Sequence, residues 1–134
     1  KLVLLIIFCP NILLANNQFF SEGLNLFKIK KFEEAKFKFE QDIVFNPKNE
    51  KSYLYLSKIF KYLEKRDLQE QNLDTVILLN PQNEEAIYNL AKLKLSASDY
   101  KRSKELNDQL IVICNKFCSQ GQKLKIEIQN LSKK

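Results

Sequence analysis

An internal repeat is the most informative feature of this sequence. The dipeptide Asn46-Pro47 recurs 34 residues later as Asn80-Pro81. Asn49 and Asn83 match in the same register, and a glutamate follows each of them. Because a fixed period of this length is typical of proteins built from small stacked units, we predict repeated motifs that share a continuous core.

Each unit carries two helical patterns. In the first unit Phe19, Gly23 and Leu26 follow the spacing of an amphipathic helix. A turn is expected near Lys30-Lys31, and a second helix follows. The apolar residues of this second helix are Phe32, Ala35, Phe39 and Ile43. Pro47 ends it, because proline cannot donate a backbone hydrogen bond and disfavours helical geometry in the residue before it.

Polar residues mark the starts of several helices. Asn49 and Asn83 are predicted N-caps, with acidic residues in the turn that follows, where negative charge suits the helix dipole. Asp67, with Glu70 three residues on, predicts a capping box for the second helix of the middle unit. Two glycines and three prolines are too few for the many tight turns of an all-β protein, so the composition favours helices.

This pattern resembles the tetratricopeptide repeat (TPR) family, whose 34-residue unit has aromatic residues, Leu, Gly, Ala and Pro at fixed places. The first unit, 16–49, supplies Phe19, Gly23, Leu26, Ala35, Phe39 and Pro47. The second, 50–83, supplies Tyr53, Leu56, Phe60, Leu73 and Pro81, with Ser57 in the glycine place and Gln69 in the alanine place. The third, 84–117, supplies Ile87, Leu90, Ala91, Tyr100 and Leu110, and departs from the pattern at Lys94, Asn107 and Asn115.

The resemblance implies an all-α fold, a right-handed superhelical solenoid of antiparallel helix pairs over residues 16–134. A segment at about 120–132 is predicted to be a capping helix that covers the last pair. Its apolar residues are Leu124, Ile126, Ile128 and Leu131. Ile126 and Ile128 alternate with charged residues, which also fits a short strand, although such a strand would have no partner.

Residues 1–15 resemble a secretory signal peptide, with a lysine, a short apolar run and Ala15 before a polar mature start at Asn16. The apolar run is too short to cross a membrane as a helix, which takes roughly 20 residues. A hydrophobic helix packed on the domain is one alternative. A second is a lipoprotein signal in which Cys9 carries the lipid, although Phe8 stands where a small residue is usual.

The composition argues against several classes of site. The chain has no histidine, which removes the commonest general base and a common metal ligand. Cys114 and Cys118, on one continuous helix, would be too far apart for a disulfide, so we expect buried thiols rather than redox or intermolecular pairing. The net charge of +6 comes mainly from lysines spread along the chain, which favours a solvated surface over nucleic-acid binding. We therefore expect no enzyme activity, metal, other cofactor or nucleic acid.

The resemblance also implies a binding surface, because in this family the first helix of each pair lines the concave face. On these helices a stripe outside the predicted core contains Phe20, Leu24, Phe27, Leu54, Lys58, Lys61, Tyr88, Lys92 and Leu95, and it is flanked by Tyr55, Tyr62 and Asn89. The three residues of the first unit are equally well explained by packing against neighbouring helices. A lysine-rich strip beside aromatic rings suits a partner segment with acidic and hydrophobic residues.

These features leave two functions in competition. The first is an exported scaffold, in the periplasm or cell envelope of a bacterium, that binds a protein or peptide through its concave face. The second is a lipid-anchored structural component of an envelope assembly complex, for which lipidated Cys9 would provide the membrane attachment. A third, an accessory domain of an enzyme, has no residue pattern in its favour. The identity of the partner and the oligomeric state stay open.

Overall fold

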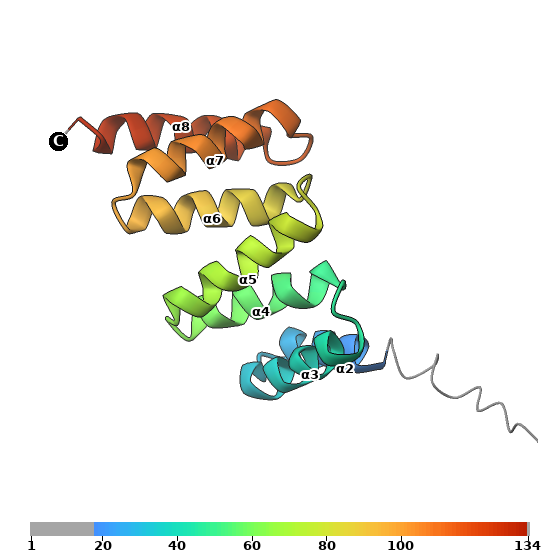
Figure 1. Ribbon diagram of the computed structural model, residues 1–134. Coiled ribbons are helices and arrows are strands. Elements are labelled where there is room, and N and C mark those ends of the chain that lie inside the picture. Colours follow the sequence, from blue (N-terminus) through green and yellow to red (C-terminus); the bar gives the residue numbers. More distant parts are fainter. Residues whose placement is uncertain (1–17, 134) are drawn as a thin grey trace, which may run out of the picture. The chain divides into compact units, whose positions relative to one another are not determined.

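The computed structural model describes residues 18–133, and the regular structure in this part of the chain is entirely helical. Figure 1 shows its seven helices: α2 (Gln18–Lys28), α3 (Phe32–Phe45), α4 (Glu50–Tyr62), α5 (Arg66–Leu79), α6 (Glu84–Ser96), α7 (Tyr100–Ile113) and α8 (Cys118–Leu131). The prediction of an all-α fold is confirmed. The expected signal segment, 1–15, lies outside the described residues, and so do Cys9 and Asn16. Between residues 18 and 133, no helix has the length and apolar character needed to span a bilayer.

The chain forms two compact units, the first ending at Asn49 and the second beginning at Glu50. In the first unit α2 packs against α3. Gly23 permits a close approach, because a Cβ atom at this position would lie 2.8 Å from the ring of Phe39. The fully buried carboxylate of Asp42 accepts hydrogen bonds from the side-chain amides of Asn46 (3.2 Å) and Asn49 (2.6 Å). The asparagines of the first Asn-Pro turn therefore fix the end of α3.

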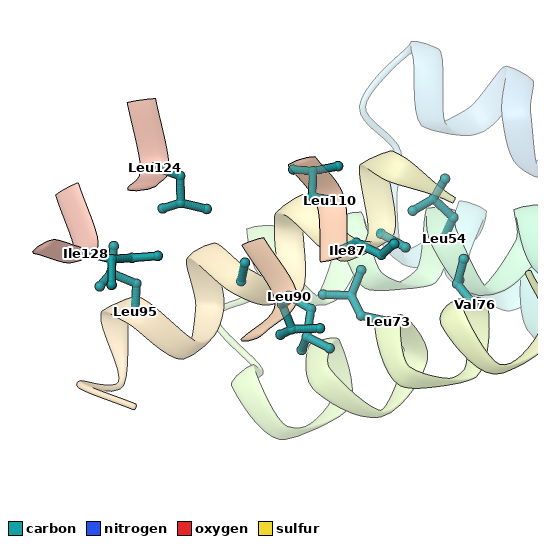
Figure 2. Close-up of a cluster of buried hydrophobic side chains, with 12 residues drawn as sticks. Leu54, Leu73, Val76, Ile87, Leu90, Leu95, Leu110, Leu124 and Ile128 are labelled. Atoms are coloured by element: carbon teal, nitrogen blue, oxygen red, sulfur yellow. The ribbon is translucent and has the colours of Figure 1, made fainter. Parts of the chain in front are cut away.

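In the second unit α4 packs on α5, α5 on α6, α6 on α7 and α7 on α8. Figure 2 shows the hydrophobic core that these helices share, a continuous cluster that runs from Leu54 on α4 to Ile128 on α8. The remaining members are Leu73, Val76, Ala86, Ile87, Leu90, Ala91, Leu95, Leu106, Leu110 and Leu124. Since no single helix pair could bury these side chains alone, the stacking of neighbours creates the core.

The turns inside the three helix pairs have the same backbone conformation. Lys30 (φ 62°), Glu64 (φ 57°) and Ser98 (φ 61°) are in the left-handed region, and they lie at the repeat spacing. In the second pair Lys65 N–H then donates to the carbonyl of Phe60, which closes the turn before α5. The turn expected near Lys30 is therefore present, and its counterparts follow in the second unit.

Two predictions about helix starts have different outcomes. Asn83 is an N-cap, since its side chain accepts a hydrogen bond from the backbone N–H of Ala86 (3.0 Å). The capping box at Asp67 is wrong. The helix α5 begins earlier, with Lys65 at the N-cap and no side-chain capping hydrogen bond, and Glu70 instead forms an ion pair with Lys94. The left-handed turn at Glu64, which the sequence did not indicate, moves the start of the helix.

The prediction for the two C-terminal cysteines is also wrong, because they form a disulfide, with an S–S distance of 2.14 Å and a Cα–Cα distance of 5.2 Å. The geometric objection assumed one continuous helix. Instead α7 ends at Ile113 and α8 begins at Cys118, so a non-helical turn of four residues, 114–117, separates the two helices. The disulfide joins the two ends of this turn.

The carboxylate of Glu84 lies against the same turn. It accepts hydrogen bonds from the backbone N–H groups of Asn115 (2.9 Å), Lys116 (2.9 Å) and Phe117 (2.8 Å). Beyond the turn, α8 buries Leu124 and Ile128 and exposes Ile126, as a helix does and a strand would not. The disulfide and Glu84 thus hold α8 onto the end of the second unit.

Candidate ligand groove

The predicted stripe of partner-binding residues divides between the two units. In the first unit Phe20, Leu24 and Phe27 are half-buried. The ring of Phe20 lies 5.7 Å from that of Phe39, and the ring of Phe27 lies 5.4 Å from that of Phe32, measured between centroids. These two phenylalanines thus have packing partners inside their own unit.

In the second unit, two members of the stripe are core residues. Leu54 is 8% exposed and Leu95 is 6% exposed, and both belong to the hydrophobic cluster of Figure 2. The expectation that they lie outside the core is therefore wrong. The physical reason for Leu95 is that α6 packs against α5, α7 and α8, so more than one of its faces is buried.

The polar members of the stripe come together in a groove. Lys58, Lys61, Asn89 and Lys92 line two adjoining pockets of ≈ 220 and ≈ 450 Å³ between α4, α5 and α6, which share Lys61, Gln69 and Asn89. The other lining residues are Ser57, Glu64, Arg66, Glu85, Leu93 and Ser96. We call this surface the basic groove.

The tyrosine of the stripe, Tyr88, and the two that flank it lie in different surroundings. The Nζ atom of Lys58 lies 4.8 Å from the centre of the Tyr55 ring, a cation–π contact. The ring of Tyr88 lies 5.5 Å from that of Phe117. Tyr62 is 66% exposed. None of the three is among the residues that line the two pockets of the basic groove.

The cations of the basic groove differ in what they contact. Lys58 forms an ion pair with Glu85 (2.8 Å), and Lys92 forms one with Glu127 (3.4 Å). Lys61 and Arg66, by contrast, have no acidic partner within 4 Å among residues 18–133. Arg66 is well suited to hold a carboxylate, because its guanidinium can donate two parallel hydrogen bonds to the two oxygens.

Two amides complete the donor set. The side chains of Gln69 and Asn89 make no hydrogen bond to any residue in the described part of the chain. Gln69 and Arg66 come from α5, the second helix of its pair, whereas the sequence prediction considered first helices alone. Gln69 occupied the alanine place of the repeat, and that departure was the one signal that could have identified it.

No protein-family model matches this sequence, and no curated protein matches it either. Solved structures do match. The TPR domain of Arabidopsis OM64 is 20% identical, with a TM-score of 0.75, and the match covers 87% of this chain and 99% of that chain. The TPR2B domain of yeast Sti1, solved as a complex with pHsp70, is 13% identical with a TM-score of 0.80, and the match covers 88% of this chain and 98% of that chain.

A bacterial structure is equally similar. The type III secretion chaperone SycD of Yersinia enterocolitica, in complex with a peptide of the translocator YopD, is 16% identical with a TM-score of 0.77. That match covers 90% of this chain and 95% of the chaperone chain. At these low sequence identities the matches establish the fold of this chain, and they do not identify what it binds. The chain has the fold of tetratricopeptide repeat domains.

Proposed function

We propose that this protein binds a segment of another protein in the basic groove of its second unit. The observation that carries the proposal is the set of uncommitted donors there: the ammonium of Lys61, the guanidinium of Arg66, and the amides of Gln69 and Asn89. These groups bind and orient anionic and polar atoms. The proposed role is thus recognition without catalysis, cofactor or nucleic acid.

The length of the basic groove suits a short segment. Its lining residues on α6 run from Glu85 through Asn89 to Ser96, along one face of the helix. At 1.5 Å per helical residue this path is about 16 Å long, which matches roughly five residues of extended chain. The complexes of yeast Sti1 and Yersinia SycD support this use of the fold, since both were solved with a partner molecule.

The charges favour an acidic partner segment. Of the charged residues that line the basic groove, Lys58 and Lys92 are paired with Glu85 and Glu127. Lys61, Arg66 and the carboxylate of Glu64 are in no ion pair among residues 18–133, so the groups that remain for a ligand carry a net charge of +1. Acidic side chains would be drawn to the two uncommitted cations, and apolar side chains would supply most of the binding free energy by burial. This agrees with the expectation of a partner with both residue types.

Reversal of the two uncommitted cations tests the proposal. Peptides selected from a random display library against the wild-type protein are measured by fluorescence anisotropy against Lys61→Glu with Arg66→Glu. We expect binding to weaken by about 1–3 kcal/mol, because attraction becomes repulsion. The control is Lys123→Glu with Lys133→Glu, which makes the same change in net charge at exposed positions outside the groove. Equal affinity of both variants would contradict the proposal.

We further propose that the protein works in an exported state. The support is the disulfide between Cys114 and Cys118, since disulfides persist in oxidising compartments such as the bacterial periplasm and are rare in the cytosol. The resemblance of residues 1–15 to a signal peptide also supports export. The alternative, a lipoprotein that is part of an envelope assembly complex, rests on Cys9 alone. Mass spectrometry of the native N-terminus separates the two, since a free Asn16 supports the soluble form and an acylated Cys9 supports the anchored one.

A further inference from the structure

Gln69 departs from the packing of its repeat position. The residues one repeat before and after it are Ala35 and Ser103, and both are fully buried. Ala35 has no polar side-chain atom, and the hydroxyl of Ser103 donates to the carbonyl of Ala91 (2.8 Å). Gln69 is only 6% exposed, yet its side-chain amide has no hydrogen-bond partner among residues 18–133.

This arrangement costs stability. The amide atoms of Gln69 keep access to the groove, since among residues 18–133 the fully buried side-chain atoms without a hydrogen-bond partner belong to Gln41 and Asn107. Fixing a long side chain nevertheless costs conformational entropy, and alanine at this position would avoid that cost, as Ala35 does in the first unit. When a chain keeps a residue that local packing disfavours, the position is a candidate for function.

The position of Gln69 shows what that function can be. It lines both pockets of the basic groove, where they adjoin, together with Asn89 and Lys61. Arg66 lies one helical turn before it on α5 and lines the larger pocket. The subsite therefore combines two amides, an ammonium and a guanidinium with the carboxylate of Glu64, which lines the larger pocket, and nitrogen donors still outnumber oxygen acceptors.

We propose that Gln69 is a recognition residue, and that with Arg66 and Asn89 it holds an acidic side chain of the bound segment. A carboxylate accepts up to about four hydrogen bonds, so it can satisfy the fork of Arg66 and one N–H from each amide. This inference rests on the proposed function, because the acidic side chain belongs to the segment in the basic groove. It adds a residue from the second helix of a pair to the recognition surface, and it gives the amide of Gln69 a protein partner that residues 18–133 do not supply.

Nuclear magnetic resonance tests the subsite directly. The probes are an acetylated and amidated hexapeptide, Leu-Asp-Glu-Leu-Asp-Leu, and its neutral counterpart, Leu-Asn-Gln-Leu-Asn-Leu. We expect the side-chain NH₂ signals of Gln69 and Asn89 to shift on titration with the acidic peptide, and the neutral peptide to bind at least tenfold more weakly. Gln69→Ala should weaken binding of the acidic peptide at least fivefold while leaving the midpoint of thermal unfolding unchanged or higher.

A matched variant separates this role from a general effect of losing a glutamine. Gln71 lies on the same helix and is exposed, so Gln71→Ala should bind the acidic peptide as the wild type does. The inference is overturned if Gln69→Ala binds normally, or if the Gln69 amide does not shift while Lys61 and Arg66 respond; the proposed function survives either result. If no signal in the groove responds to the acidic peptide, both proposals fail together.

Discussion

Three residues, one in each helix pair, have a backbone conformation that their side chains disfavour. Lys30, Glu64 and Ser98 have φ values of 62°, 57° and 61°, in the left-handed region where a Cβ atom crowds the following carbonyl. Glycine carries no such penalty, and it is the usual residue where a helix ends in this conformation. The repeat spacing of these residues shows that the turn geometry is repeated although the residue types differ.

Ser98→Gly is predicted to stabilise the protein. Removing the left-handed strain should raise the free energy of unfolding by about 1–2 kcal/mol. The greater conformational freedom of glycine in the unfolded chain lowers it by about 0.4–1 kcal/mol. The net gain should be about 0.5–1 kcal/mol in urea unfolding. Ser96→Gly is the control, because Ser96 is helical and glycine there should destabilise. A lower midpoint for Ser98→Gly would contradict the argument.

Ala35→Gln is predicted to destabilise the first unit. Ala35 is fully buried on α3, and a longer side chain would have to displace its neighbours. Such overpacking costs about 1–3 kcal/mol. Thermal melts followed by circular dichroism measure the change. An unchanged midpoint would mean that position 35 has room for a larger residue, as position 69 does.

Among the elements of the fold, the turn between α7 and α8 is stabilised differently from the turns that follow the earlier repeats. In the earlier repeats, Pro47 and Pro81 follow the second helix of the pair. The third repeat has no proline at this place, and the turn is fixed by the disulfide and by Glu84. Hydrogen bonds from the backbone N–H groups of Phe117, Asn115 and Lys116 hold the pKa of the Glu84 carboxyl below its usual value.

Glu84 should therefore make stability depend on pH. Because its pKa is lower in the folded state, its contribution is fully present above the pKa of the unfolded chain, 4.5, and is lost as the pH falls through the folded value. Glu84→Gln should lower the unfolding midpoint at pH 7, and the difference from wild type should shrink as the solution becomes more acidic than pH 4.5. Glu105→Gln, at an exposed ion pair, is the control and should show a much smaller difference. A difference that stays constant with pH would count against this role.

The disulfide should contribute to stability through the unfolded chain. Closing so short a loop removes about 2 kcal/mol of conformational entropy from the unfolded state at 25 °C. Reduction, or Cys114→Ser with Cys118→Ser, should lower the free energy of unfolding by about this amount. Reductant should have no further effect on the double variant. If both cysteines react with a thiol reagent in the native, unreduced protein, the disulfide assignment fails.

On the scale of the whole molecule, the net charge of +6 should influence the rate constant for association with a partner. A positively charged protein attracts an acidic segment over distances comparable to the Debye length, about 8 Å at physiological ionic strength. The association rate constant of a selected acidic peptide should therefore fall as salt is added, whereas the dissociation rate constant should change little. Stopped-flow fluorescence measures both. An association rate that does not depend on salt would show that steering plays no part.

The sequence predicted the fold well because the repeat and the apolar spacing act locally. The period between Asn46-Pro47 and Asn80-Pro81, with helical spacing inside each unit, was enough to predict an all-α stack of helix pairs. The division into a signal segment and three repeats stays a prediction. The left-handed conformation of the three turns could not be predicted, because lysine, glutamate and serine do not favour a positive φ as glycine does.

The groove was predicted only in part. Lys61 and Asn89 were found from their place on first helices, and both line it. Leu95 was misplaced because a single helical face cannot describe α6, which packs against α5, α7 and α8. Leu54 was misplaced as well, since it belongs to the same hydrophobic cluster. Arg66 and Gln69 were missed because they approach from the second helix of a pair. Contacts between segments distant in the sequence decide such positions, and a periodicity analysis does not contain them.

The disulfide at the end of the second unit has a consequence beyond holding a turn. A molecule that has closed it has lost two hydrogens to an oxidant. The covalent state of Cys114 and Cys118 therefore depends on the redox conditions around each copy. The intact mass of protein taken directly from cells, with thiols blocked at lysis, would report what fraction of the population is in an oxidising compartment at that moment.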